Sequence, residues 1–301
     1  MQHRHVDHDH GRTHFVEAGE GSDILLLHGW PQTWYEWRKV LPLLSGDHRL
    51  IVPDLRGLGD SRTVSCDFDK VSVARDLIDL LDHLGIDRLD VVGHDWGGPV
   101  AFALACLAPH RIRSLAIVDV VIPGDGRCAG LAQGGKRWHH LFHRTPRLPE
   151  VLTKGRERDY LAWFYEEYSE RAGAVPDAAL DEYVRTYRAG STMSNGFEYY
   201  RSAVTDAEWF SSRIAKDGRL TMPVLGVAGG AGRGRGSETA ASLECVASDV
   251  TCHVIAGCGH LVPEEAPEEL VALLRRFWGR DEVEGAASPT DAIDQEREAP
   301  A

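Results

Sequence analysis

The sequence predicts an α/β fold in which a mostly parallel, eight-stranded sheet is flanked by helices. Short apolar runs, such as residues 24–27, alternate with segments whose apolar residues recur at helical spacing, such as 71–84. This alternation is typical of parallel sheets that are covered on both faces. It stops after Asp119, where aromatic-rich helical patterns follow without a convincing strand. An all-helical insertion is therefore expected after the strand that ends at Asp119.

The individual elements follow from their local patterns. A polar hairpin is expected over 4–17, with its turn near 9–11. Buried strands are expected at the apolar runs 23–27, 50–52, 89–92, 115–119, 222–227 and 251–255. Helices are expected at 34–41, 71–84, 100–107 and 267–277, and within the insertion at 138–142, 156–168, 177–187 and 195–210.

These elements divide the chain into a core formed by residues 1–123 and 216–280, a helical cap at 124–215, and a tail at 281–301. The tail is acidic and has no apolar period, so disorder is expected there. A helical insertion between strands is expected to cover the carboxyl edge of the sheet, where α/β folds place their binding sites.

Composition narrows the possible partners and the compartment. The 301 residues carry a formal net charge of −13, which argues against nucleic acid or an anionic membrane as a partner. The six cysteines form no metal-binding spacing, and the polar residues 1–14 lack the apolar segment of a signal peptide. A cytoplasmic protein with free thiols and without cofactor or metal is expected. The histidines at 3, 5, 8, 10 and 14 fit a solvated hairpin better than a metal site.

The most informative stretch is Gly-His-Asp-Trp-Gly at 93–97, between an apolar run and a helical pattern. A nucleophile flanked by small residues two positions away, between strand and helix, is the nucleophile elbow of α/β-hydrolases. Its best-known form has serine at the centre, whereas this chain has Asp95. A carboxylate attacks saturated carbon and forms a covalent ester. The motif therefore predicts alkyl transfer from an epoxide or an alkyl halide.

Hydrolysis of such an ester needs a base at the same edge of the sheet. His260 follows the last predicted strand and precedes the last helix, which is the position of the histidine in α/β-hydrolases. An acid should orient this histidine, and Asp119 at a strand end is the favoured candidate. Glu238 and acids just after Pro123, such as Asp125, stay open as alternatives.

Backbone N–H groups should stabilise the oxyanion that forms when water attacks the ester. The expected donors are Trp96, directly after the nucleophile, and Trp30 in the turn at 28–31. Opening an epoxide also needs a proton donor from the cap. The candidates are two phenols and two imidazoles, each of which could instead serve only in packing: Tyr199, Tyr200, His139 and His140.

With these motifs assembled, the chain resembles the epoxide hydrolases of the α/β-hydrolase fold over nearly all of residues 4–280. The shared motifs lie at 28–31, 54–59, 93–98 and 257–260. It looks most similar to the branch called Cif-like, on the cap stretches 138–139, 148–150, 155–158 and 197–201. This resemblance implies a His/Tyr pair, His139 and Tyr200, as the ring-opening hydrogen-bond donors. It also implies Asp119 as the charge-relay acid.

The resemblance implies an epoxide hydrolase that converts an apolar epoxide to a vicinal diol through an ester on Asp95, with water activated by His260. The expected partner is a small-molecule epoxide, and a homodimer is possible. Cap aromatics are candidates to line the substrate pocket: Trp138, Phe142, Phe164, Phe197 and Tyr199.

Two other functions use the same scaffold. A haloalkane or haloacid dehalogenase would share the nucleophile. Haloalkane dehalogenases usually have Asn where Trp30 stands, and fluoroacetate dehalogenases carry arginines where Trp96 and Pro99 stand. Both dehalogenase interpretations therefore lose support. A ligand-binding homologue without turnover is the third possibility, and the complete set of nucleophile, base and acid argues against it.

Overall fold

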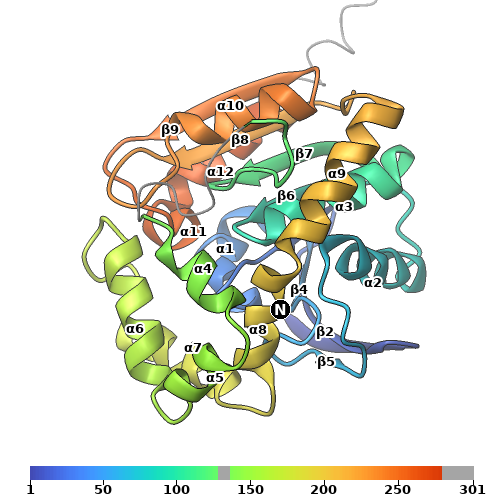
Figure 1. The fold of residues 1–301 in the computed structure, drawn as a ribbon. Helices are drawn as coiled ribbons and strands as arrows, with labels where there is room; N and C mark the ends of the chain where they lie inside the picture. The colour runs from blue at the N-terminus through green and yellow to red at the C-terminus, as the bar shows by residue number, and fades with distance from the viewer. Residues whose placement is uncertain (128–135, 280–301) are drawn as a thin grey trace, which may run out of the picture.

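The computed structural model describes residues 1–127 and 136–279, so Cys128 and the predicted tail at 281–301 lie outside the described residues. The described part contains one sheet, whose strands cross the centre of Figure 1. Its nine strands are β1 (Gln2–His8), β2 (Gly11–Ala18), β3 (Ser22–Leu27), β4 (His48–Pro53), β5 (Arg62–Thr63), β6 (Leu89–His94), β7 (Ile112–Val118), β8 (Val224–Gly229) and β9 (Val250–Ile255).

The strands follow the order β1-β2-β4-β3-β6-β7-β8-β9, and the short β5 pairs with β2. The pairs β1–β2, β2–β4 and β2–β5 are antiparallel, whereas every pair from β4 to β9 is parallel. The mostly parallel sheet is therefore confirmed. Eight strands form the continuous path, and β5, with only two residues, is too short to leave a pattern in the sequence. The parallel strands all end at the same edge.

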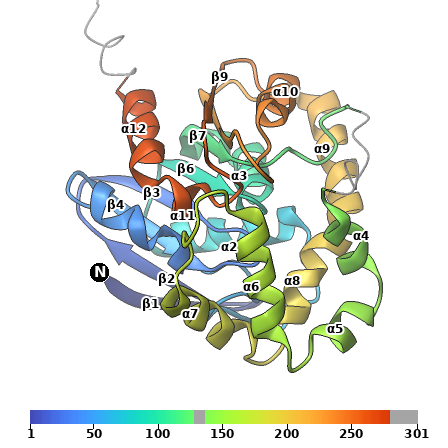
Figure 2. The same cartoon turned by 90° about the vertical axis from the view of Figure 1, so that its left-hand side faces the viewer.

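Helices cover both faces of this sheet (Figure 2). Along β3, Leu25 and Leu27 pack in one apolar cluster while Ile24 and Leu26 pack in the other, as expected for a strand buried on both faces. The first cluster includes residues of α2 (Lys70–His83), α3 (Gly97–Leu107) and α10 (Ser237–Val246), and the second includes residues of η1 (Trp34–Lys39), α1 (Leu41–Leu44) and α12 (Pro267–Trp278). The turn η2 (Pro109–Arg111) precedes β7, and α11 (Val262–Glu265) precedes α12.

Between β7 and β8 the described chain forms helices and no strand, which confirms the helical insertion. The helices are α4 (Trp138–Arg144), α5 (Leu148–Thr153), α6 (Glu157–Tyr168), α7 (Asp177–Tyr187), α8 (Thr192–Arg201) and α9 (Ala203–Asp217). Helices α4 to α8 gather on one side of the sheet (Figures 1 and 2). The single helix predicted over 195–210 is two helices that meet at Ser202. Helices α5 and α10 were not predicted.

A buried ion pair fastens the insertion to the core. The side chain of Lys70, the first residue of α2, is fully buried, and its Nζ lies 2.9 Å from Asp206 Oδ2 in α9. Nζ also donates to Ser202 Oγ at 3.0 Å and to the carbonyl of Tyr199. The same ammonium lies 4.0 Å from the ring centroid of Trp96. The α8–α9 junction is thus held directly beside the residue that follows Asp95.

Within residues 1–127 and 136–279, none of the helices combines the length and the apolar character needed to span a bilayer. The cysteines in this part of the chain are free thiols: Cys66, Cys106, Cys245, Cys252 and Cys258.

Candidate active site

Asp95 lies in the tight turn between β6 and α3, with a φ of 46°. This left-handed backbone is uncommon for a residue other than glycine. The turn also needs glycine on both sides: a Cβ at Gly93 would lie 2.3 Å from the carbonyl oxygen of Gly97, and a Cβ at Gly97 would lie 2.3 Å from that of Leu27. The sequence thus builds a bend that presents one carboxylate at the carboxyl edge of the sheet.

His260 stands opposite this carboxylate, in the loop between β9 and α11. Its Nε2 lies 3.5 Å from Asp95 Oδ2, and its Nδ1 lies 2.6 Å from Asp119 Oδ2. The imidazole therefore lies between two carboxylates. Such an arrangement lets Asp119 fix the ring orientation while Nε2 faces the space beside Asp95.

Asp119 follows β7 directly, has a φ of 49° and is fully buried. Its Oδ1 accepts the N–H groups of Gly229 and Arg235, each at 2.8 Å, which leaves Oδ2 for His260. The two alternative acids have other partners. Glu238 contacts the guanidinium of Arg235 at 3.2 Å, and Asp125 accepts the hydroxyl of Ser242 at 2.6 Å. The structure therefore brings Asp119, rather than either alternative, to His260.

Backbone donors surround the Asp95 carboxylate. The N–H of Trp30 donates to Oδ1 at 2.9 Å, and the N–H of Trp96 also favours the ionised carboxylate. Burial alone would raise the pKa of Asp95. The hydrogen bond and charge of His260, together with the charge of His94, outweigh burial and hold this pKa well below its usual range. Asp95 is therefore ionised at neutral pH.

A second buried pair lies behind the loop of His260, and sequence reasoning missed it. His94 Nε2 donates to the carbonyl oxygen of His260 at 2.9 Å, and its Nδ1 lies 3.2 Å from Glu36 Oε2. Burial alone would lower the pKa of His94, but the charge of Glu36 outweighs it and raises this pKa to about 9. Because both ring nitrogens face acceptors, His94 is an imidazolium at neutral pH. Its position inside the 93–97 motif was the only local sequence feature that could have indicated a role for His94 in the site.

A narrow cavity joins these groups to the helical insertion. It is lined by Trp30, Pro31, Asp95, His139, Phe164, Tyr165, Tyr168, Tyr200, His260 and Leu261. Tyr200 of α8 and His139 of α4 thus line the same cavity as Asp95, and the rings of Tyr200 and His139 lie 5.5 Å apart. Burial, followed by the charge of Asp95, raises the pKa of Tyr200 well above its usual value, so the phenol keeps its proton. Burial lowers the pKa of His139, which is therefore neutral.

Tyr168, at the end of α6, is a site residue that the sequence did not single out. Its hydroxyl lies 2.9 Å from His139 Nδ1, and its carbonyl accepts the N–H of His260 at 2.8 Å. The hydroxyl also donates to the carbonyl oxygen of Lys136 at 3.0 Å. Tyr168 therefore contacts residues on both sides of the cavity. Its only sequence signal was its position as the last residue of a predicted helix.

The predicted pocket aromatics occupy different environments. Phe164 lines the narrow cavity, with its ring 4.8 Å from that of Trp30. Phe197 is fully buried, with its ring 6.4 Å from that of Trp30. Trp138, whose ring is 5.7 Å from that of Phe142, is 38% exposed. Tyr199 points elsewhere, because its hydroxyl donates to the carbonyl of Arg56 at 3.0 Å.

A larger cavity of about 310 Å³ opens on the other side of Asp95. Its apolar wall comes from the loop after β7 and from α9, and His140 and Arg235 also line it. Burial, followed by the charge of Arg235, lowers the pKa of His140 to about 3, so His140 is neutral. The sequence did not predict this cavity, since the loop at 120–127 has no periodic pattern.

Comparison with known proteins identifies the family. The family model described as alpha/beta hydrolase fold matches residues 24–267. The chain is an α/β-hydrolase. This hydrolase is 34% identical over 280 residues to a protein named soluble epoxide hydrolase from a Corynebacterium species, covering 89% of this chain and 93% of the relative.

Solved structures agree with this assignment. Cfl2 from Burkholderia cenocepacia matches this hydrolase with a TM-score of 0.87 and 38% identity, over 91% of this chain and 95% of that one. A structure titled epoxide hydrolase CorEH without ligand matches with a TM-score of 0.85 and 33% identity, over 93% and 99%. The predicted fold class and the resemblance to epoxide hydrolases are confirmed. The narrower Cif-like assignment stays a prediction.

Proposed function

We propose that this hydrolase converts an epoxide to a vicinal diol through a covalent ester on Asp95. The observation that carries the proposal is the placement of the Asp95 carboxylate 3.5 Å from His260 Nε2, in a cavity that Tyr200 and His139 also line. The names of the relatives support the same reaction, since several are called epoxide hydrolases. The narrow cavity offers a nucleophile on one side and a proton donor on the other.

In the first step, an oxygen of the ionised Asp95 carboxylate attacks one epoxide carbon. The carbon–oxygen bond of the three-membered ring breaks as the ester bond forms, and the electron pair moves to the departing oxygen. Tyr200 transfers its proton to this oxygen, and His139 donates a hydrogen bond to it. Such donation needs the proton of neutral His139 on Nε2. The Tyr168 hydroxyl must therefore turn its single proton from the carbonyl of Lys136, to which it donates at 3.0 Å, towards His139 Nδ1.

In the second step, His260 removes a proton from a water molecule, which attacks the carbonyl carbon of the ester. Asp119 stabilises the imidazolium that results. The oxyanion accepts hydrogen bonds from the N–H groups of Trp30 and Trp96. When this intermediate collapses, the bond between the carbonyl carbon and the alkyl oxygen breaks. The departing alkoxide takes the proton of the His260 imidazolium, and the diol leaves with one oxygen from Asp95. The carboxylic acid formed on Asp95 loses its proton, and this proton restores the phenol of Tyr200.

The proposal assigns a role to each part of the chain. Residues 124–215 act as a cap, and residues 1–123 and 216–280 form the hydrolase core. The narrow cavity holds the epoxide ring, and the larger cavity of about 310 Å³ holds its apolar substituent. Placement in the cytoplasm and assembly as a homodimer stay predictions.

The variant His260→Gln tests the two-step route. With an epoxide that the wild type converts to diol, this variant should accumulate an ester, visible as an intact-mass increase equal to the substrate mass. A single turnover of the wild type in ¹⁸O-labelled water should place the heavy oxygen on Asp95 rather than on the diol. Absence of the adduct, together with labelled diol, would show direct attack by water. Halide release from haloalkanes and haloacetates, without diol formation from epoxides, would identify a dehalogenase instead.

A further inference from the structure

The β1–β2 hairpin gathers imidazoles on one of its faces, away from the proposed reaction. His3 and His5 share a face of β1, because alternate residues of a strand point the same way. His5 lies directly opposite His14 of β2 in the register. The ring of His14 lies 5.2 Å from that of His3 and 5.1 Å from that of His5. Three potential metal ligands therefore meet on this face.

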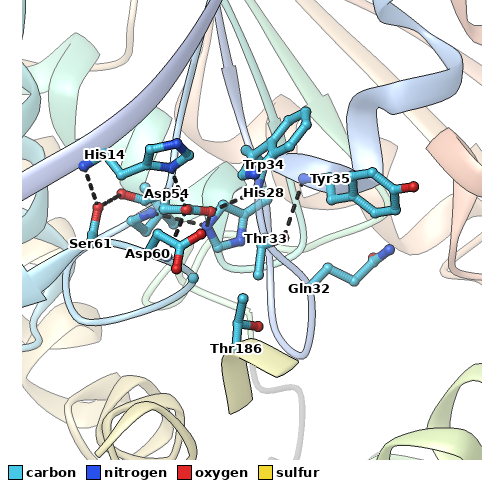
Figure 3. Close-up of polar contacts among 12 residues, drawn as sticks. His14, His28, Gln32, Thr33, Trp34, Tyr35, Asp54, Asp60, Ser61 and Thr186 are labelled. Carbon is cyan, nitrogen blue, oxygen red and sulfur yellow. Dashed lines mark hydrogen bonds and ion pairs between the residues drawn. The ribbon is translucent and has the colours of Figure 1, made fainter. Parts of the chain in front are cut away.

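The tautomer of His14 is fixed by a buried carboxylate. The imidazole of His14 contacts the carboxylate of Asp54 (Figure 3). Nδ1 lies 2.7 Å from Oδ2, and both side chains are buried. Asp54 also accepts the N–H groups of Trp34 at 2.9 Å and Asp60 at 2.8 Å. Because the carboxylate is an acceptor, His14 carries its proton on Nδ1 and its lone pair on Nε2. A histidine that donates to a carboxylate in this way is the usual arrangement behind a metal-bound imidazole.

The other nitrogen of His14, Nε2, accepts a hydrogen bond from a second imidazole. His14 Nε2 lies 3.0 Å from His3 Nδ1. Two imidazole nitrogens bound to one tetrahedral zinc ion lie about 3.4 Å apart. Binding one ion therefore requires this pair to separate by about 0.4 Å and His3 to carry its proton on Nε2 instead of Nδ1. His5 is exposed, with its ring 5.1 Å from that of His14, and its side chain must rotate to bring a third nitrogen to the same point.

We propose that His3, His5 and His14 bind one transition-metal ion of the Zn²⁺ type, with water as the fourth ligand and Asp54 as the outer partner of His14. Imidazole suits this group of metals. The contact between His14 and Asp54 is what changes the expectation from sequence, which favoured a solvated hairpin. A bound ion would link both strands of the hairpin and stabilise the folded state.

A neighbouring acidic arrangement is a weaker candidate. His14, Asp54 and Asp60 offer ligand atoms that all lie within 4.8 Å of one another. However, Asp54 already accepts three hydrogen bonds, and Asp60 is held by Arg185 at 2.7 and 3.1 Å. The imidazole side of His14 is therefore the favoured position for the ion.

Titration of the full chain with Co²⁺ and Zn²⁺ tests the site. One equivalent of Co²⁺ should give the visible absorption of a tetrahedral centre. His3→Asn and His5→Asn should each weaken binding by more than about tenfold. His10→Asn, at the exposed hairpin turn, is the matched control and should bind as the wild type does. Zn²⁺ should raise the melting temperature of the wild type and of His10→Asn, but not of His3→Asn.

Two results would overturn this proposal. One is wild-type affinity in the His3→Asn/His5→Asn double variant. The other is loss of binding in Asp60→Asn while His3→Asn binds normally, which would place the ion among the acids. His3 and His5 are exposed, so their variants should retain the fold, and circular dichroism checks this. Epoxide hydrolysis is a separate readout and should be unchanged in these variants.

Discussion

His94 donates a hydrogen bond of 2.9 Å to the carbonyl oxygen of His260, so the residue before the nucleophile also holds the loop of the proposed base. The other ring nitrogen of His94 pairs with Glu36 at 3.2 Å, and both side chains are buried. One buried ion pair therefore positions two loops of the site, from β6 and from β9.

Replacing His94 with Gln should destabilise the protein. The change leaves the Glu36 carboxylate buried without its cation, which typically costs about 3–5 kcal/mol. Urea unfolding measures the loss. The double variant Glu36→Gln/His94→Gln removes both charges and should recover part of the stability. Equal stability of wild type and His94→Gln would contradict the ion pair.

The same pair predicts how stability depends on pH. The charge of Glu36 raises the pKa of His94 from 6.5 to about 9, and burial raises that of Glu36 from 4.5 to about 7. Both groups bind protons more tightly in the folded state, so their contribution decreases as pH rises through these values. The contribution of this pair to the free energy of unfolding should fall between pH 5 and about pH 9. The stability difference between the wild type and the double variant should therefore shrink over this range, and a difference that does not depend on pH would argue against this assignment.

Asp119→Asn should slow hydrolysis of the ester, the second step, more than its formation, the first step. The amide cannot stabilise the imidazolium of His260, and the corresponding change in a serine protease lowers kcat about 10⁴-fold. We expect a loss of about 10³–10⁴-fold here, with the Asp95 ester accumulating. Single-turnover reactions that are quenched at successive times and examined by mass spectrometry measure the rates of ester formation and ester hydrolysis. A kcat within tenfold of the wild-type value would show that another acid stabilises the imidazolium of His260.

Tyr200→Phe should slow ester formation by about 10²-fold, since the departing oxygen loses its proton donor. Tyr187→Phe is a matched control, because this buried phenol donates to the carbonyl of Gln32 at 3.1 Å. The control should lose about 1 kcal/mol of stability and retain its rate of ester formation. Equal rates in the two variants would exclude Tyr200 as the donor.

Tyr168→Phe tests the tautomer of His139. Without the hydroxyl that lies 2.9 Å from Nδ1, the imidazole can carry its proton on Nδ1 and lose its hydrogen bond to the substrate oxygen. Ester formation should slow by about tenfold. In the double variant Tyr168→Phe/His139→Gln, the rate of ester formation should fall by less than the product of the two single effects, because both changes remove the same interaction. Additive effects in this double-mutant cycle would mean that Tyr168 acts independently.

Local patterns predicted most of the sheet and the Asp95 turn, because both depend on short-range chemistry. Apolar runs marked the strands, and steric constraints explain the glycines around the nucleophile. The same patterns merged α8 and α9, since the break at Ser202 depends on contacts with Lys70 and Phe68 from another part of the chain.

The candidate site was only partly predictable for the same reason. Asp95, His260 and Asp119 lie at strand ends, where topology indicates their neighbours. Glu36 and Tyr168 lie in helical segments with no local mark, and their importance comes from distant contacts with His94 and His139. Glu238 and Asp125 could be separated from Asp119 only by knowing where the loops fold.

The buried ammonium of Lys70 restricts how substrate can enter. If α8 and α9 moved away from α2 as one rigid lid, Lys70 would lose its contacts with Asp206, Ser202 and Tyr199. Its charge would then be left buried without a partner. Entry through a wide hinge motion is therefore costly. Smaller movements at the mouth between the β7 loop and α9 would admit the epoxide while this anchor stays intact.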